Sequence, residues 1–323
     1  MPDTPADFKA FRAMSAHLGQ DPLRVQGPGG NTSIKQGGVL WIKASGTELA
    51  EAETREIFVA VDRAAALAEA QGLAGDGSCK ATVIDKALTL RPSIETTFHA
   101  ALDWAVVAHT HSVATLTHAI THEGRTAAKD KLAGLPAAFV PYAKPGLPLT
   151  QAIMARTTPA TQVFVLENHG LIICAANVDA TTTLMEEVEA RLALPARPVV
   201  PDLPDTAPPE GFVWAAESWI ARDPRAAALA RAGSYYPDHV VFLGPALPLG
   251  DHDGQPPAIL IEGTGIALRG RATASQRAML RCLSDVLARL PADWTLEPIG
   301  AEAETALLDW DAEKYRQALA ARS

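Results

Sequence analysis

The sequence of 323 residues predicts an α/β protein. Short apolar runs, typical of strands, alternate with longer segments whose apolar residues recur every three or four positions, which is typical of helices. A proline-rich segment at 195–211 follows, and a second set of such patterns lies beyond it. Proline neither donates to a sheet nor fits inside a helix, so this segment is expected to be an extended linker. We therefore expect a domain over 1–195, a linker over 196–211 and an α/β extension over 212–323.

The predicted elements of the first domain begin with an amphipathic helix at 7–19, whose apolar residues are three and four positions apart. Two short apolar runs follow, at 32–35 and 39–43. The turn pair Gly37 and Gly38 separates them, which indicates a β-hairpin. Glycine-rich loops on both sides of this hairpin leave much backbone exposed for binding.

The rest of the first domain continues the alternation of strands and helices. Apolar runs predict strands at 57–62, 104–111, 137–142, 161–168 and 171–175. Helical spacing predicts helices at 63–71, 94–102 and 177–194. The second of these helices follows Ser93, which we expect to be its N-cap because a serine hydroxyl can accept from a free helical N–H group.

The C-terminal extension has its own element pattern. It predicts a helix near 213–222, a strand at 239–244, a hairpin at 258–270 and a helix at 275–290. Apolar residues at helical spacing recur at 306–319, and we expect this segment to serve packing or subunit contacts. The charged residues within 309–316 are expected on a solvated face.

Composition and charge exclude several classes of function. Apolar residues make up 48% and charged residues 20% of the chain, which is ordinary for a globular protein. With 37 acidic against 28 basic residues, general binding to nucleic acid or to an anionic membrane is not expected. The chain starts with polar and acidic residues, and no apolar run is long enough for a membrane span. Three scattered cysteines predict no disulfide framework, so we expect a cytoplasmic protein.

Four residues in three segments indicate a metal site. His109 and His111 lie two positions apart on a predicted strand, so both side chains face the same way. His169 follows another strand, and Glu95 begins a helix. Taken singly, these residues have structural alternatives: hydrogen-bonded histidines and an acid that stabilises a helix dipole. Together, three imidazoles and one carboxylate suit a Zn²⁺ ion with an exchangeable fourth position.

The segments GPGGNTSIK, RPSIE, VVAHTHS and LENHG, in this order and spacing, resemble the class II aldolase/adducin family. The resemblance covers roughly 7–195. The C-terminal part, with AGSYYPDHVVFLGP and LLDWDAEKYRQAL, resembles the extension of longer members related to the rhamnulose-1-phosphate aldolase part of bifunctional aldolase/dehydrogenases. We accordingly expect a three-layer α/β/α domain with a mainly antiparallel central sheet, and a homo-oligomer, commonly a tetramer.

The resemblance also implies roles for the candidate metal residues. It assigns His109, His111 and His169 as ligands of a divalent cation, usually Zn²⁺, with other divalent ions as alternatives. It assigns Glu95 as the group that transfers the proton. Non-enzymatic relatives such as adducin lack this ligand set, so its presence favours an enzyme. His99, one helical turn after Glu95, is expected to be a hydrogen-bonded core residue, with orientation of Glu95 as the alternative.

Family aldolases bind the substrate phosphate with loop amides and hydroxyls. The matching positions here are Asn31, Ser45, Gly46 and Ser93, and Lys43 beside the turn could add charge. At the position after Ser93, short sugar-phosphate aldolases often carry a second serine, whereas this chain has Ile94. One potential phosphate donor is therefore missing.

The implied reaction is the reversible aldol cleavage of a ketose phosphate to dihydroxyacetone phosphate and an aldehyde. Cleavage beside a ketone leaves negative oxygens, which a Zn²⁺ ion stabilises without a Schiff-base lysine. Within the family, a sugar-phosphate 4-epimerase and a 3-oxo-acid phosphate decarboxylase are alternatives. A non-catalytic, adducin-like binding protein is the alternative of another class. No nucleic acid or membrane partner is expected.

Overall fold

The computed structural model describes residues 2–200, 203–250 and 255–322. Its larger sheet has seven strands in the order β3-β2-β1-β4-β7-β6-β5. Neighbouring strands pair antiparallel, except β5 with β6, which pair parallel. The expected mainly antiparallel sheet is thereby confirmed. The strands are β1 Asn31–Gln36, β2 Val39–Lys43, β3 Phe58–Asp62, β4 Val106–Thr110, β5 Ala137–Val140, β6 Val163–Leu166 and β7 Gly170–Ala175.

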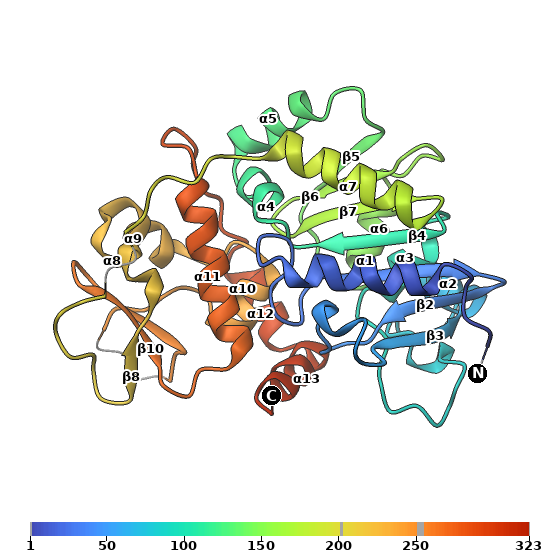
Figure 1. The fold of residues 1–323 in the computed structure, drawn as a ribbon, viewed down its shortest axis with the longest axis horizontal. Coiled ribbons are helices and arrows are strands. Elements are labelled where there is room, and N and C mark those ends of the chain that lie inside the picture. Colours follow the sequence, from blue (N-terminus) through green and yellow to red (C-terminus); the bar gives the residue numbers. More distant parts are fainter. Residues whose placement is uncertain (1, 201–202, 251–254, 323) are drawn as a thin grey trace.

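Helices cover both faces of this sheet, as the predicted three-layer arrangement requires. Alternate residues of β4 point to opposite sides, so Ala108 packs with α1 and α7 while Val107 packs with α3 and α6. In Figure 1, α1 and α7 lie in front of the sheet. The helices are α1 Phe8–Gln20, α2 Arg63–Ala70, α3 Thr96–Ala101, α4 Val113–Ala119, α5 His122–Lys131, α6 Leu147–Met154 and α7 Val178–Leu192.

The C-terminal part contains a three-stranded sheet in the order β8-β10-β9, with helices packed beside it. Its strands are β8 Phe212–Trp214, β9 Ala258–Ile261 and β10 Gly265–Arg269. Its helices are α8 Trp219–Arg222, α9 Pro224–Ala232, α10 Pro237–Leu243, α11 Ala274–Arg289, α12 Ala301–Leu308 and α13 Asp311–Ala320. None of the described helices is both long and apolar enough to cross a membrane.

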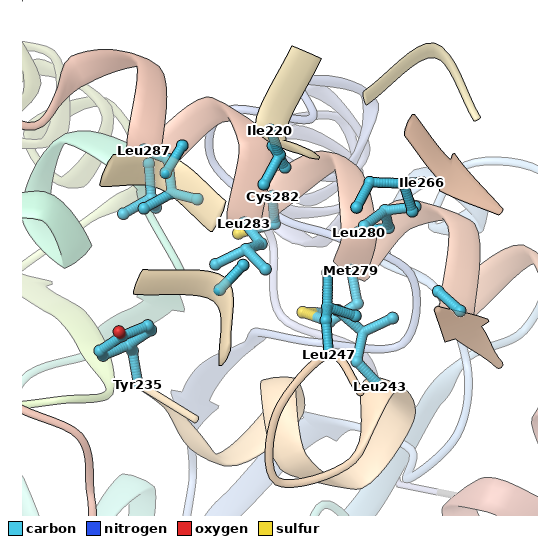
Figure 2. Packing of buried hydrophobic residues seen from close by; sticks show 14 of the residues in the cluster. Ile220, Tyr235, Leu243, Leu247, Ile266, Met279, Leu280, Cys282, Leu283 and Leu287 are labelled. Carbon is cyan, nitrogen blue, oxygen red and sulfur yellow. The ribbon is translucent and has the colours of Figure 1, made fainter. Parts of the chain in front are cut away.

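Helix α11 carries the largest core cluster of the described residues. A capping box at Thr273 and Gln276 fixes its start. Its apolar face, with Leu280, Leu283 and Leu287, points toward Ile220 and other residues of the extension (Figure 2). The same cluster includes Val113, Leu116 and Ile120 at α4 of the first part. The two parts of the chain therefore share this hydrophobic core cluster.

Helix α13 returns to the first part of the chain. A Cβ atom at Gly46 would lie 2.3 Å from Leu319 Cδ1, so this helix packs directly over the turn after β2. Figure 1 shows α13, in red, below the junction of the two parts. The boundaries expected at 195 and 212 stay predictions, and residues 201–202 of the expected linker lie outside the described residues.

Two of the elements predicted for the extension were wrong. The segment 239–244 lies mainly in helix α10, not in a strand; all seven residues of this helix are buried, and a short apolar run does not distinguish a buried helix from a buried strand. Pro237 at the first turn suits a helix start. The expected helix near 213–222 is instead strand β8 followed, after a 3₁₀ turn, by the single turn α8.

The expected N-cap of α3 was also wrong. Glu95, not Ser93, occupies the N-cap position. The Ser93 hydroxyl instead accepts from the Glu95 N–H group at 3.2 Å, within the turn that leads into the helix. The helix therefore begins two residues later than its serine indicates, and the Ser93 side chain lies beside the pocket described below.

Candidate metal centre and active site

Three buried histidines meet at one edge of the larger sheet. His109 is on β4, His111 follows that strand directly, and His169 lies in the turn between β6 and β7. One ring nitrogen from each lies within 4.8 Å of the others. The β4–β7 pairing places these segments side by side. A Cβ atom at Gly170 would lie 2.4 Å from the Thr110 carbonyl oxygen, so only glycine lets the turn approach β4 this closely.

The Glu95 carboxylate is the fourth member of this group. Its Oε2 atom is 3.5 Å from His109 Nε2, and its Oε1 atom is 3.4 Å from His169 Nε2. The amide of Asn31 donates to Oε2 at 2.8 Å. The structure thus brings together the four residues that the sequence pattern singled out.

Burial sets the protonation of the site. It lowers the pKa of His109 to about 4 and that of His169 to about 3, so both rings are neutral near pH 7. Burial alone would raise the pKa of Glu95, but the nearby histidine rings and the Asn31 amide bring it below its ordinary value. Neutral imidazoles beside an ionised carboxylate are the forms that bind a metal cation.

The donor atoms fit a divalent cation. His109 Nδ1–H donates to the Leu171 carbonyl at 2.9 Å, which orients the ring and leaves Nε2 with a lone pair. This Nε2 atom and Glu95 Oε1 are buried and have no hydrogen-bond partner among the described residues. An unsatisfied buried polar atom costs about 1–3 kcal/mol, which a shared cation would offset. The three histidines can therefore hold a metal ion.

A second hydrogen-bonded layer holds Glu95. The neutral ring of buried His99 donates from Nε2 to Asn31 Oδ1 at 2.5 Å and accepts from the Ser33 hydroxyl at 2.7 Å. Asn31 is fixed in this way and directs its amide to Glu95. His99 is therefore a hydrogen-bonded core residue that acts on the carboxylate through Asn31.

Some of the residues expected to bind phosphate line a pocket beside the metal site, and others do not. Ser45 and Ser93 line a small pocket beside Glu95, and Lys43 lines it too. The Lys43 ammonium is buried and donates to the Pro28 carbonyl at 2.8 Å, and burial lowers its pKa to about 7.

Gly46 is the exception among these residues. It lies behind the Ser45 turn, under Leu319, and is not among the residues that line the pocket.

A larger cavity of about 740 Å³ adjoins this pocket and shares Ser45, Ile94 and Pro145 with it. The cations of Lys80, Arg91 and Lys144 and the carboxylates of Asp76, Asp309 and Asp311 line it. The Arg91 guanidinium lies 3.9 Å from the centre of the Tyr315 ring, which belongs to α13. The extension therefore forms one wall of the space that leads to the histidines.

Three pocket residues were missed by sequence reasoning: Asp238, Glu313 and Arg316. Glu313 and Arg316 were expected on a solvated face, and that prediction was wrong, since they are only 1% and 7% exposed. Both lie on the buried stripe of α13 together with Ala320. Charged residues on the inward stripe of an amphipathic helix are the signal that could have identified them.

Comparison with known proteins decides the family. Residues 11–194, more than half of the chain, match the family model described as Class II Aldolase and Adducin N-terminal domain. The chain belongs to the class II aldolase and adducin family. The three histidines and Glu95 all lie within the matched family domain, whereas Asp238, Glu313 and Arg316 lie outside it.

Relatives of this class II aldolase family chain include a curated protein and solved structures. The "Uncharacterized oxidoreductase YuxG" of Bacillus subtilis (strain 168) is 27% identical over 191 residues, which cover 53% of this chain and 27% of that protein. The chain thus spans about a quarter of the length of that relative.

A solved N-terminal class II aldolase domain from Thermoplasma acidophilum is 25% identical, with a TM-score of 0.52, over 59% of this chain and 94% of that one. An L-fuculose 1-phosphate aldolase is 22% identical over 58% of this chain and 84% of that one, with a TM-score of 0.41. The second likeness is too distant to bear on function.

Proposed function

We propose that this chain is a Zn²⁺-dependent class II aldolase that reversibly cleaves a ketose phosphate into dihydroxyacetone phosphate and an aldehyde. The observation that carries the proposal is the group of three buried histidines around one buried carboxylate, in which His109 Nε2 and Glu95 Oε1 have no hydrogen-bond partner among the described residues. A purely structural cluster would satisfy those atoms within the protein.

Each residue of the group has a part in the proposed reaction. His109, His111 and His169 would hold the cation, which when bound would stabilise the negative charge that develops on the substrate oxygens as the carbon–carbon bond breaks. Glu95 lies within 3.5 Å of two of these rings, where it can take a proton from the carbon beside the ketone during addition and return it to that carbon during cleavage. The amide of Asn31 keeps the carboxylate aimed at the reacting atoms.

The walls of the pocket support an anionic substrate. We place the phosphate at the hydroxyls of Ser45 and Ser93, which line the pocket together with Lys43. Asn31 and Gly46 act indirectly in this proposal, because one is bonded to Glu95 and the other lies under Leu319.

The adjoining cavity gives room for the far end of the sugar. Its Arg91 guanidinium, which lies over the Tyr315 ring, could add charge to the phosphate site.

An assay with purified, Zn²⁺-loaded protein tests the proposal. Ketose 1-phosphates are supplied, and dihydroxyacetone phosphate is detected by coupled reduction to glycerol 3-phosphate. We expect turnover that a chelator abolishes and added Zn²⁺ restores. Absence of dihydroxyacetone phosphate from every ketose phosphate tested would overturn the aldolase assignment. Formation of an epimeric sugar phosphate would indicate the 4-epimerase alternative, and release of carbon dioxide would indicate the decarboxylase. Absence of bound metal would indicate an adducin-like binding protein.

Family resemblance also supports a homo-oligomer, commonly a tetramer. Light scattering after size-exclusion chromatography tests this, since the chain mass is 34.1 kDa and the tetramer mass would be about four times larger. A mass equal to that of one chain would rule the oligomer out.

A further inference from the structure

We propose that Asp238, a residue of the C-terminal extension, positions the metal ligand His111, and that Arg316 and Glu313 hold Asp238 in place. The inference rests on the metal site of the proposed function, but not on which reaction that site performs. If it holds, a residue of the C-terminal extension determines the orientation of one metal ligand.

The first step is the contact between the carboxylate and the ring. Asp238 Oδ2 lies 3.3 Å from His111 Nδ1, and the two residues are 1% and 4% exposed. This nitrogen has no other polar partner among the described residues, and Asp238 Oδ2 is the acceptor within reach of it. A carboxylate here favours the tautomer with the proton on Nδ1, which leaves the lone pair of Nε2 for a cation. Such a partner also makes an imidazole a better ligand.

The loop before β1 is shaped to admit this pair. A Cβ atom at Gly29 would lie 2.8 Å from Asp238 Oδ2 and 2.8 Å from His111 Nδ1. Any side chain at this position would therefore enter the space in which the carboxylate meets the ring. The first part of the chain thus leaves room for a residue that lies more than 200 positions further along.

The second step is the clamp on Asp238. Arg316 contacts both of its oxygens, with Nη1 2.8 Å from Oδ1 and Nη2 3.2 Å from Oδ2. The same guanidinium contacts Glu313 Oε2 at 2.8 Å. This planar fork fixes both the position and the rotation of the carboxylate.

The clamp also fixes the charge of the acceptor. The Arg316 guanidinium donates to both oxygens of Asp238, and such a two-point pair forms with an ionised carboxylate. Asp238 therefore remains a carboxylate, which can only accept from the ring and cannot donate to it.

The variant Asp238→Asn tests the inference without any turnover. An asparagine amide has one acceptor oxygen and one donor NH₂ group. It therefore cannot accept from Arg316 and from His111 with two oxygens, as the carboxylate can. We expect the full chain to bind Zn²⁺ about 10–100-fold more weakly, measured by competition with a chromophoric chelator. The visible spectrum of the Co²⁺-loaded protein should change as well, which loss of stability alone would not produce.

Asp285→Asn is the matched control. Asp285 lies on α11 in the same extension, and its carboxylate pairs with Arg289 at 2.9 Å. It is not among the residues that line the pocket. We expect the Zn²⁺ affinity of this variant to stay within about twofold of the parent, because the ion pair that it loses is not in contact with the metal ligands.

Arg316→Lys decides the question if Asp238→Asn does not fold. Lysine keeps the positive charge but lacks the planar fork, so Asp238 loses one of its two fixed contacts. We expect Zn²⁺ binding weakened by roughly 3–10-fold. If Asp238→Asn folds, a Zn²⁺ affinity within twofold of the parent would overturn the inference. If it does not fold, the same result in Arg316→Lys would overturn it.

Discussion

Burial keeps His109 and His169 neutral, and this has a consequence for stability in acid. Their pKa values are lowered to about 4 and about 3, whereas an unfolded histidine titrates near 6.5. Between pH 6.5 and about 4, the unfolded chain therefore binds protons that the native chain does not. The free energy of unfolding decreases as the pH is lowered through this range.

We expect the metal-free protein to lose up to about 1.4 kcal/mol per pH unit for each such histidine. Urea titrations of chelator-treated protein over this range measure the slope. A free energy of unfolding that stays constant from neutral pH down to about pH 5 would contradict the prediction.

The roles of Glu95 and the histidines separate in the variant Glu95→Gln. The isosteric amide leaves the three rings in place, so we expect bound Zn²⁺ to stay close to one ion per chain. Proton transfer is lost, and the rate of cleavage should fall by about 10²–10⁴-fold. Metal analysis and steady-state kinetics on one preparation measure both. Near-normal turnover would show that another group transfers the proton.

Sequence reasoning identified the metal residues because local rules apply to them. Alternation along a strand places His109 and His111 on one face, and the glycine after His169 marks a close turn. Asp238 and Arg316 escaped notice because no local rule connects them to His111. Their contact depends on how the extension docks, which neither spacing nor periodicity encodes.

At the scale of elements, the turn between β6 and β7 is the tightest constraint on the site. In Gly170→Ala, the new Cβ atom would lie 2.4 Å from the carbonyl oxygen of Thr110, the residue between His109 and His111. We expect a loss of roughly 2 kcal/mol or more in the free energy of unfolding, together with weaker Zn²⁺ binding. Urea unfolding and chelator competition measure the two effects.

Gly134→Ala serves as the control for this variant. Gly134 also has a positive φ, of 87°, but a Cβ atom added there would have no neighbour within 4 Å. We expect a cost of roughly 1 kcal/mol from the backbone alone and unchanged Zn²⁺ binding. Equal effects of the two variants would argue against the close approach of the turn to β4.

The elements of the first part were largely predictable, and those of the extension less so. Strands such as β2 and β7 combine apolar runs with clear turn residues, so their type followed from the sequence. Helix α10 is buried on all sides and is too short to show a period of 3.6, so its apolar run was read as a strand. Burial on every face removes the pattern on which such predictions depend.

For the whole molecule, the shared core predicts that both parts unfold together. Leu283 of α11 is fully buried in the cluster that also contains residues of α4. We expect Leu283→Ala to lower the free energy of unfolding by about 2–5 kcal/mol. The transitions followed by tryptophan fluorescence and by far-ultraviolet circular dichroism should coincide and shift by the same amount. Two separated transitions would show that the parts fold independently.

The docking of α13 has a consequence for the evolution of the family. Asp238 is useful to His111 only with Arg316, because without that guanidinium it would be a buried carboxylate lacking its cation, and Arg316 without Asp238 would keep only Glu313 as a partner. Homologues that retain the extension should therefore keep both residues or replace both at once. Lineages without the extension must orient the corresponding imidazole by other means, so the identity of that partner becomes a marker of common descent.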